Sequence, residues 1–112
     1  MADASLHLTG QELKKFLREH PNDLVIADFY ADWCPHCQSL HPTLEALARA
    51  YKPQGVSVVM VNTDEEEQTA LDYGVEVLPT IFLIRDEKIL AREVGAKAYS
   101  FWESWIKKYK EV

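Results

Sequence analysis

Cysteine, basic residues and uninterrupted hydrophobic sequence are all scarce in this chain, and each shortage excludes a class of protein. Only 2 cysteines occur among the 112 residues, too few for the disulfide framework that holds many small secreted domains together. No stretch of about 20 apolar residues is present, so we expect no membrane insertion. The two cysteines lie three positions apart, which favours a reactive site over a structural brace.

Basic side chains are outnumbered by acidic ones. The sequence has 12 Lys and Arg against 18 Asp and Glu, giving a formal net charge of −6. Nucleic-acid affinity depends largely on Lys and Arg that neutralise phosphates. We therefore expect no nucleic-acid partner.

The amino terminus lacks the features of a secretion signal. Residues 1–10 have neither a basic start nor an apolar core. With Met1 as the natural start, the expected location is the cytoplasm; a signal peptide removed before Met1 would instead mean a periplasmic or secreted protein.

What the chain does contain is enough apolar sequence for one packed core. Hydrophobic residues make up 47% of it, so we predict a single domain over residues 1–112. A capping box at Thr9 and Glu12 indicates a first helix that ends near His20. The other predicted elements are strands at 24–30, 56–61, 80–84 and 89–94, and helices starting at Pro35, spanning 64–73, and starting with a second capping box at Ser100 and Glu103.

The order of these elements predicts an α/β fold with a mixed sheet. The strand at 24–30 is apolar on both faces, as is typical of a covered central strand. A strand, a helix and a second strand over residues 24–61 form a parallel crossover unit. The last two strands are separated by only a few polar residues, which favours an antiparallel hairpin.

The two cysteines have the spacing that thiol-disulfide exchange requires. One thiolate must be exposed for attack, and a second thiol must be close enough to resolve the mixed disulfide. Cys34 precedes a helix whose free amides and positive dipole end stabilise an anion there, so it is the expected nucleophile. Cys37, one turn inside, is the expected resolving thiol. Trp102 and Trp105, by contrast, are expected in the core of the last helix.

The dipeptide between the cysteines is expected to set the redox poise. Pro35 suits a first helical turn, where its missing amide hydrogen has no partner. A ring nitrogen of His36 that donates to the Cys34 sulfur would stabilise the reduced thiolate and make the oxidised pair a stronger oxidant. The alternative is a His36 side chain that simply points into solvent.

A metal site is the main alternative for the cysteines. Cys34, His36, Cys37 and His41 are four potential ligands within eight residues, but four ligands from one helix start do not converge easily on a tetrahedral ion. We therefore predict no metal and no cofactor, with half a site completed by a second subunit as the remaining metal hypothesis. An inert structural pair is less favoured still.

Several segments together resemble the thioredoxin family. The resemblance spans nearly the whole chain, and the spacing of its parts is more specific than the cysteine motif alone. The matching segments are Ala27 to Cys34 followed by Cys37, then Pro42, Tyr73-Gly74-Val75, Leu78-Pro79-Thr80 and Val94-Gly95-Ala96.

The resemblance implies a thioredoxin fold and assigns roles to several residues. Cys34 would attack and Cys37 would resolve. Pro79 would follow a cis peptide bond, a minority form even before proline, and the backbone of Leu78 would pair with an extended substrate. Trp33, Leu78, Gly95 and Ala96 would surround the disulfide with a shallow apolar surface for polypeptide.

Asp28 is an exception within its apolar strand. Burial there should raise the pKa of its carboxyl toward the range useful in proton transfer, although a buried Asp satisfied by neighbouring amides is the simpler interpretation. The resemblance implies that Asp28 accepts the proton of the resolving cysteine. Thioredoxins usually have a lysine on the adjacent strand, whereas this chain has Met60, which should raise the pKa of Asp28 further.

The direction of electron flow is the least determined part of the prediction. Thioredoxins typically have Gly-Pro between the cysteines, whereas Pro35-His36 is the dipeptide of periplasmic disulfide oxidases. No inserted helical domain of that oxidase family is present, and the paired glycines of glutaredoxins are absent. We expect a monomeric reductant of protein disulfides, recharged by a thioredoxin reductase. The alternatives are an oxidase or isomerase, a non-catalytic interaction module with this fold, and the metal-binding dimer.

Overall fold

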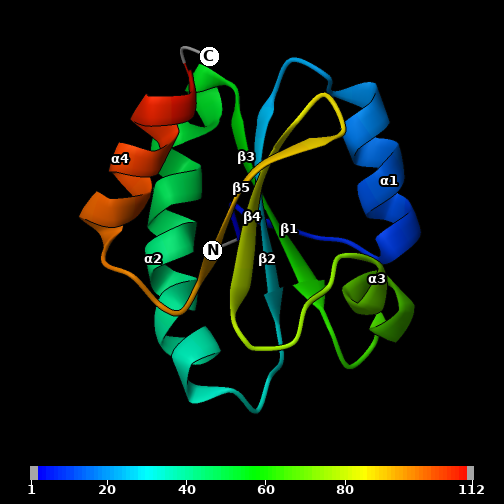
Figure 1. Ribbon diagram of the computed structural model, residues 1–112. Coiled ribbons are helices and arrows are strands. Elements are labelled where there is room, and N and C mark those ends of the chain that lie inside the picture. The colour runs from blue at the N-terminus through cyan, green and yellow to red at the C-terminus, as the bar shows by residue number, and fades with distance from the viewer. Residues whose placement is uncertain (1–2, 111–112) are drawn as a thin grey trace.

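The computed structural model of the protein describes residues 3–110, a range that stops short of both ends of the predicted domain, 1–112. A five-stranded mixed sheet with the order β1-β3-β2-β4-β5 lies at its centre (Figure 1). The strands are β1 (Leu6–His7), β2 (Leu24–Tyr30), β3 (Val56–Asn62), β4 (Thr80–Arg85) and β5 (Lys88–Val94).

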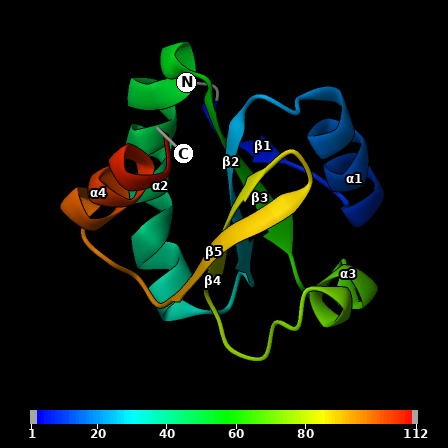
Figure 2. The same cartoon turned by 45° about the horizontal axis from the view of Figure 1, so that its top comes forward.

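Helices cover both faces of this sheet. They are α1 (Gly10–Glu19), α2 (Pro35–Tyr51), α3 (Glu67–Asp72) and α4 (Tyr99–Lys110), with a short 3₁₀ turn at Lys52–Gln54. The helices α2 and α4 pack on one face, and α1 and α3 pack on the other, as the two views in Figures 1 and 2 agree. None of the helices within residues 3–110 is both long and apolar enough to cross a membrane.

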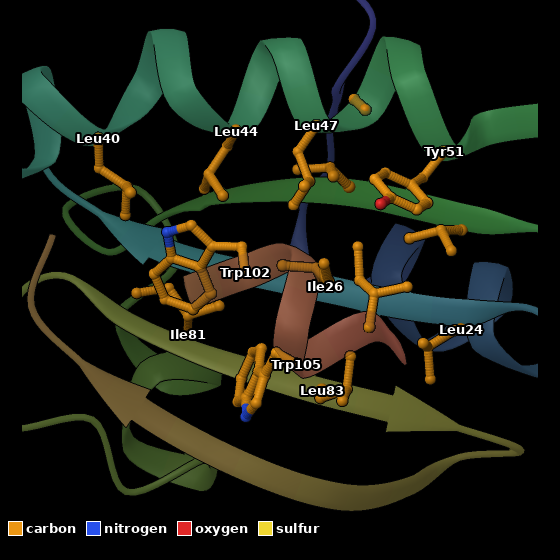
Figure 3. Packing of buried hydrophobic residues seen from close by; sticks show 14 of the residues in the cluster. Leu24, Ile26, Leu40, Leu44, Leu47, Tyr51, Ile81, Leu83, Trp102 and Trp105 are labelled. Carbon is orange, nitrogen blue, oxygen red and sulfur yellow. The ribbon is translucent and has the colours of Figure 1, made fainter. Parts of the chain in front are cut away.

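The alternation of side chains along β2 divides the core between the two layers. Leu24 and Ile26 point into the cluster under α2 and α4, whereas Val25 and Phe29 point into the cluster under α1 and α3. Because successive side chains of a strand point to opposite faces, Asp28 continues the row that faces α2. Figure 3 shows this first cluster, with leucines of α2 directed toward the sheet, Trp102 of α4 close to them, and Trp105 nearer to Leu83 of β4.

The mixed sheet confirms the predicted α/β architecture. Strand β2 pairs in parallel with β3 along its whole length, and antiparallel with β4 on its other side. The parallel pair is joined by α2, and the hairpin β4–β5 extends the sheet. This arrangement brings the start of α2 to the end of β2 (Figure 1), where the two cysteines lie.

The predicted capping box is correct for the start of α1 and wrong for the start of α4. Thr9 and Glu12 make the predicted capping box at α1. The predicted cap at Ser100 is wrong, because α4 has already begun at Tyr99 and the amide of Phe101 donates to the Ala98 carbonyl. Trp102 and Trp105 are buried, as predicted.

Two further boundaries differ from the sequence-based prediction. The helix predicted over 64–73 is confined to Glu67–Asp72, since the residues before it form turns. The hairpin strands are longer than predicted, so that only two residues form the turn between them. Strand β1 was not predicted, because it has only two residues and both are exposed.

Candidate active site

The cysteine pair lies at the junction of β2 and α2. Cys34 is the N-cap residue of α2, and its sulfur accepts a hydrogen bond from the amide of Cys37 at 3.3 Å. Pro35 occupies the first turn, as predicted. Both cysteines are free thiols and nearly buried, with 4% of Cys34 and 3% of Cys37 exposed. A free amide directed at Cys34 stabilises a thiolate at that position.

The second thiol is held in its protonated form. Burial, followed by the hydrogen bond with Cys34 and the nearby charge of Asp28, raises the pKa of Cys37 to about 12. A thiol with such a pKa is a poor nucleophile near neutral pH, because only the thiolate attacks a disulfide. Cys37 therefore needs a base before it can attack.

Asp28 is close enough for its charge to raise the pKa of Cys37, and its carboxyl could serve as that base. Its side chain is fully buried, and neither carboxyl oxygen has a hydrogen-bond partner among the described residues. The alternative of a buried Asp satisfied by neighbouring amides is thereby excluded for residues 3–110. Burial raises the pKa of Asp28 to about 7, where proton exchange at neutral pH is most efficient.

The register of the sheet accounts for the lack of a charged partner. Asp28 pairs with Met60 in the parallel ladder of β2 and β3, so the two side chains share the face toward α2. Met60 is buried in the core cluster. The sequence analysis predicted that Met60 replaces the usual lysine beside Asp28. The register confirms this position, so the residue paired with Asp28 on β3 carries no charge.

A hollow of about 570 Å³ opens beside Cys34. Trp33 and Leu78 lie on its wall, in agreement with the predicted apolar surface, and Trp33 is 67% exposed. The Trp33 indole nitrogen donates to Asp64 at 2.9 Å. This contact holds the exposed ring, and the sequence analysis did not predict it because Trp33 and Asp64 lie 31 positions apart.

The loop before β4 borders the same hollow. The Leu78–Pro79 peptide bond is cis, and the amide of Gly95 donates to the Pro79 carbonyl at 3.0 Å. Gly95 therefore lies beside this loop, but neither it nor Ala96 lines the hollow. Ala96 is exposed.

His36 is exposed at the outer end of α2. Its carbonyl accepts a hydrogen bond from Ser39, but no hydrogen bond within residues 3–110 joins its ring to Cys34. His36 nevertheless lines the same hollow as Cys34. An influence of His36 on the cysteines would thus be exerted through charge across this hollow.

A second hollow, of about 320 Å³, reaches Cys37 from the other side. Two histidines from different elements line it, His7 of β1 and His41 of α2. The sequence had suggested His41 only as a metal ligand and had assigned no role to His7. Their proximity depends on the unpredicted strand β1.

The four proposed ligands of a metal site do not converge. Within residues 3–110, the one cluster of at least three His, Cys, Asp or Glu side chains with suitably close ligand atoms consists of Asp3, His41 and Glu45. It contains neither cysteine. The geometry therefore gives no support to a metal ion held by Cys34 and Cys37.

Comparison with known proteins identifies the family. The family model described as Thioredoxin matches residues 4–108. The chain belongs to the thioredoxin family. A crystal structure of thioredoxin from Fasciola hepatica superposes with a TM-score of 0.87 at 32% identity, covering 94% of this chain and 99% of that one. The thioredoxin fold inferred from the resemblance is confirmed.

The relatives differ in length and name. A protein disulfide-isomerase of Aspergillus oryzae is 42% identical over 90 residues, which are 80% of this chain but only 17% of that protein. A thioredoxin of Porphyra purpurea is 35% identical over 89 residues, 79% of this chain and 82% of that protein. This chain thus spans under a fifth of the isomerase. The two names together support a thiol-disulfide oxidoreductase.

Proposed function

We propose that the protein reduces disulfide bonds of other proteins, with Cys34 as the nucleophile and Cys37 as the resolving thiol. The Cys34 thiolate attacks one substrate sulfur, forms a mixed disulfide and expels the other substrate sulfur as a thiolate. Cys37 then attacks the Cys34 sulfur, so that the Cys34–Cys37 bond forms and the second substrate sulfur leaves with its electron pair. The substrate gains two electrons, and the protein dithiol is oxidised.

The observation that carries the proposal is the difference between the two cysteines. Cys34 has an amide directed at its sulfur at the start of α2 and borders an open hollow, as a nucleophile requires. The pKa of Cys37 is raised chiefly by burial, and the thiol lies near the carboxyl of Asp28. We assign Asp28 as the group that accepts the proton of Cys37 when it attacks.

The hollow beside Cys34 is the proposed binding surface for an extended segment of substrate. Trp33 and Leu78 would contact its side chains, while the backbone at Leu78 would pair with its main chain. Gly95 is proposed to shape this surface indirectly, through its hydrogen bond to Pro79. Ala96 lies outside the hollow and is proposed to contact only a longer substrate.

An oxidase or isomerase is the second candidate, and the exposed His36 favours it. A histidine beside Cys34 favours the thiolate and with it the reduced protein, which makes the disulfide a stronger oxidant. Against this, no hydrogen bond described for the chain reaches Cys34 from the His36 ring. We therefore retain reduction as the leading proposal, with a cytoplasmic location, a monomeric state and recharging by a thioredoxin reductase as its corollaries.

Substitution of each cysteine tests the assigned roles. Cys34→Ser should abolish reduction of insulin disulfides by dithiothreitol through this protein, because the nucleophile is gone. Cys37→Ser should retain the attack and accumulate a mixed disulfide, detected as a covalent adduct by mass spectrometry. Wild-type turnover in Cys34→Ser, or the same adduct yield in wild type and Cys37→Ser, would contradict the assignment.

A further inference from the structure

The two cysteines open onto different hollows. Cys34 borders the hollow of Trp33 and Leu78, whereas Cys37 lines the one of His7 and His41. The substrate disulfide must reach Cys34, so the first hollow has a defined use. The second reaches only the resolving thiol and has none in the mechanism described so far.

The resolving step leaves a proton in a place without access to water. Cys37 loses its proton to Asp28, whose side chain is 0% exposed and does not line either hollow. Asp28 has no charged or hydrogen-bonded partner within residues 3–110, and Met60 occupies the adjacent position on β3. The proton must leave this pair for the resolving step to be completed, and Cys37 is the member of the pair that adjoins a hollow.

His41 is placed to receive it. Cys37 and His41 lie four positions apart in α2, so their side chains are neighbours on one face of the helix. Both line the hollow of about 320 Å³. His41 is half-buried, and the two ring nitrogens of an imidazole can accept and donate protons. The opening of this hollow gives it contact with solvent that Asp28 lacks.

The N-terminal segment holds the wall of this hollow in place. Glu45, one further turn along the same face of α2, accepts hydrogen bonds from the amides of Ala4 and Ser5 and from the Ser5 hydroxyl. Burial alone would raise the pKa of Glu45, but these hydrogen bonds and the nearby charge of His41 lower it. Glu45 is therefore committed to anchoring the segment that brings His7 to the hollow.

The charges around the two imidazoles are predominantly negative. His7 pairs with Asp3 at 3.3 Å, its ring lies edge-on to Tyr30, and its centroid is 6.2 Å from that of His41. The titratable or charged groups that face the pair are Asp3, Glu12, Tyr30, Asp32, Cys37, Glu45, Glu65 and Glu66, with Arg49 paired to Glu45.

We propose that His41 carries the proton of the resolving step from the Cys37 and Asp28 pair to solvent through the hollow that it shares with Cys37. This inference rests on the proposed function, because it requires Cys37 to resolve a mixed disulfide. As the Cys34–Cys37 bond forms, one proton leaves the Cys37 thiol, passes to the Asp28 carboxylate and on to a ring nitrogen of His41, and is then released to water. The electron pair left on Cys37 forms the bond to Cys34. His7 lies at the rim of the hollow and is not a required carrier.

The test separates the two sulfur steps in one experiment. Reduced protein is mixed in a stopped-flow instrument with an aromatic disulfide that releases one coloured thiolate when Cys34 attacks and a second when Cys37 resolves. His41→Gln should leave the first phase unchanged and slow the second roughly tenfold at pH 7, below the 100-fold or more that a positioned general base contributes when it acts alone. The slowing should diminish above pH 9, where hydroxide removes the proton directly.

Controls distinguish a proton carrier from a structural residue. His20→Gln, a substitution at the exposed end of α1, should leave both phases unchanged. Imidazole added to His41→Ala should restore the second phase in proportion to its concentration, which a purely structural defect would not allow. An unchanged second phase in His41→Gln, or equal slowing of both phases, would overturn the inference. Failure of the first phase in the wild type would instead contradict the proposed function.

Discussion

Asp28 combines two properties that individual residues seldom combine, complete burial and an unpaired carboxyl. It occupies a position in β2 where Leu24 and Ile26 set the pattern of apolar side chains toward α2. Placing a carboxyl there costs stability whenever it is ionised, because a buried charge without a partner loses its hydration. This position is close enough to Cys37 for the charge of Asp28 to raise the pKa of its thiol.

The pH dependence of stability should reveal this cost. The pKa of Asp28 is about 7 in the folded protein, against about 3.9 for an unperturbed Asp. The folded state therefore binds the proton more tightly, so the contribution to stability is complete below pH ~4, is lost as the pH rises toward 7, and stays lost above it. Asp28→Asn should be more stable than wild type at pH 8 by several kcal/mol, about 4 at most, and similar to it at pH 4.

Urea unfolding of the reduced proteins at a series of pH values measures this difference. Equal slopes of stability against pH in wild type and Asp28→Asn would contradict the account. Met60→Lys serves as a test of the cause, since it places a positive charge beside Asp28 on β3. It should lower the pKa of Asp28 and shift the pH range of the stability loss downward, whereas an unshifted range would show that Asp28 is not the group responsible for the loss.

For single helices and strands, sequence patterns predicted the features that depend on contacts between residues close together in the chain. The capping box at Thr9 and Glu12 uses residues within one turn, and the sequence placed it correctly. The same pattern at Ser100 gave a wrong prediction, because α4 starts one residue earlier, at Tyr99. The indole of Trp102 donates to the Lys97 carbonyl just before this start, a contact that the capping pattern does not report. Strand β1 depends on pairing with β3, which no local pattern of exposed residues reports.

The hairpin turn between β4 and β5 is an element that the sequence does not optimise. Asp86 and Glu87 both adopt left-handed backbone conformations, with φ of 52° and 63°. Two-residue hairpin turns of this kind favour Asn or Asp followed by Gly, because a side chain raises the energy of the left-handed conformation. Glu87→Gly should therefore stabilise the protein by about 1 kcal/mol and raise Tm by about 4 °C.

Differential scanning calorimetry measures this change in Tm. A matched variant at Gly55 tests whether the backbone effect has the expected direction. Gly55 has a φ of 79° with no heavy atom near the position that a Cβ would occupy. Gly55→Ala should thus lower the stability by about 1 kcal/mol through backbone conformation alone. A lower Tm for Glu87→Gly, despite the expected loss in Gly55→Ala, would show that the Glu87 side chain makes a stabilising interaction outweighing the backbone effect.

For the whole molecule, the fold and the cysteine pair could be predicted from the sequence, whereas the surroundings of Cys37 could not. The motif at Cys34 and Cys37 is contiguous, and the pairing of Asp28 with Met60 follows from the order of parallel strands. The hollow of His7 and His41 requires β1, α2 and the anchoring of the N-terminal segment by Glu45 to be assembled first. Contacts between distant segments of this kind leave no periodic signal in a sequence.

The overall architecture does not determine the reduction potential of the cysteine pair, which depends on the atoms around Cys34. Two relatives with the same kind of domain bear the names thioredoxin and protein disulfide-isomerase. Proteins of these two classes differ by roughly 90 mV in potential, which is about 4 kcal/mol for a two-electron couple. A hydrogen bond to a charged group contributes about 1.5–3 kcal/mol, so one such bond to a cysteine sulfur would supply much of that difference.

The equilibrium potential of the Cys34/Cys37 couple against glutathione at pH 7 is the most direct test of the proposed reductant. Because no hydrogen bond within residues 3–110 joins the ring of the exposed His36 to Cys34, we predict a reducing value near the approximately −270 mV that is typical of thioredoxin. A value of about −180 mV or higher, in the range of disulfide isomerases and oxidases, would contradict the account and make oxidation or isomerisation the function of this site.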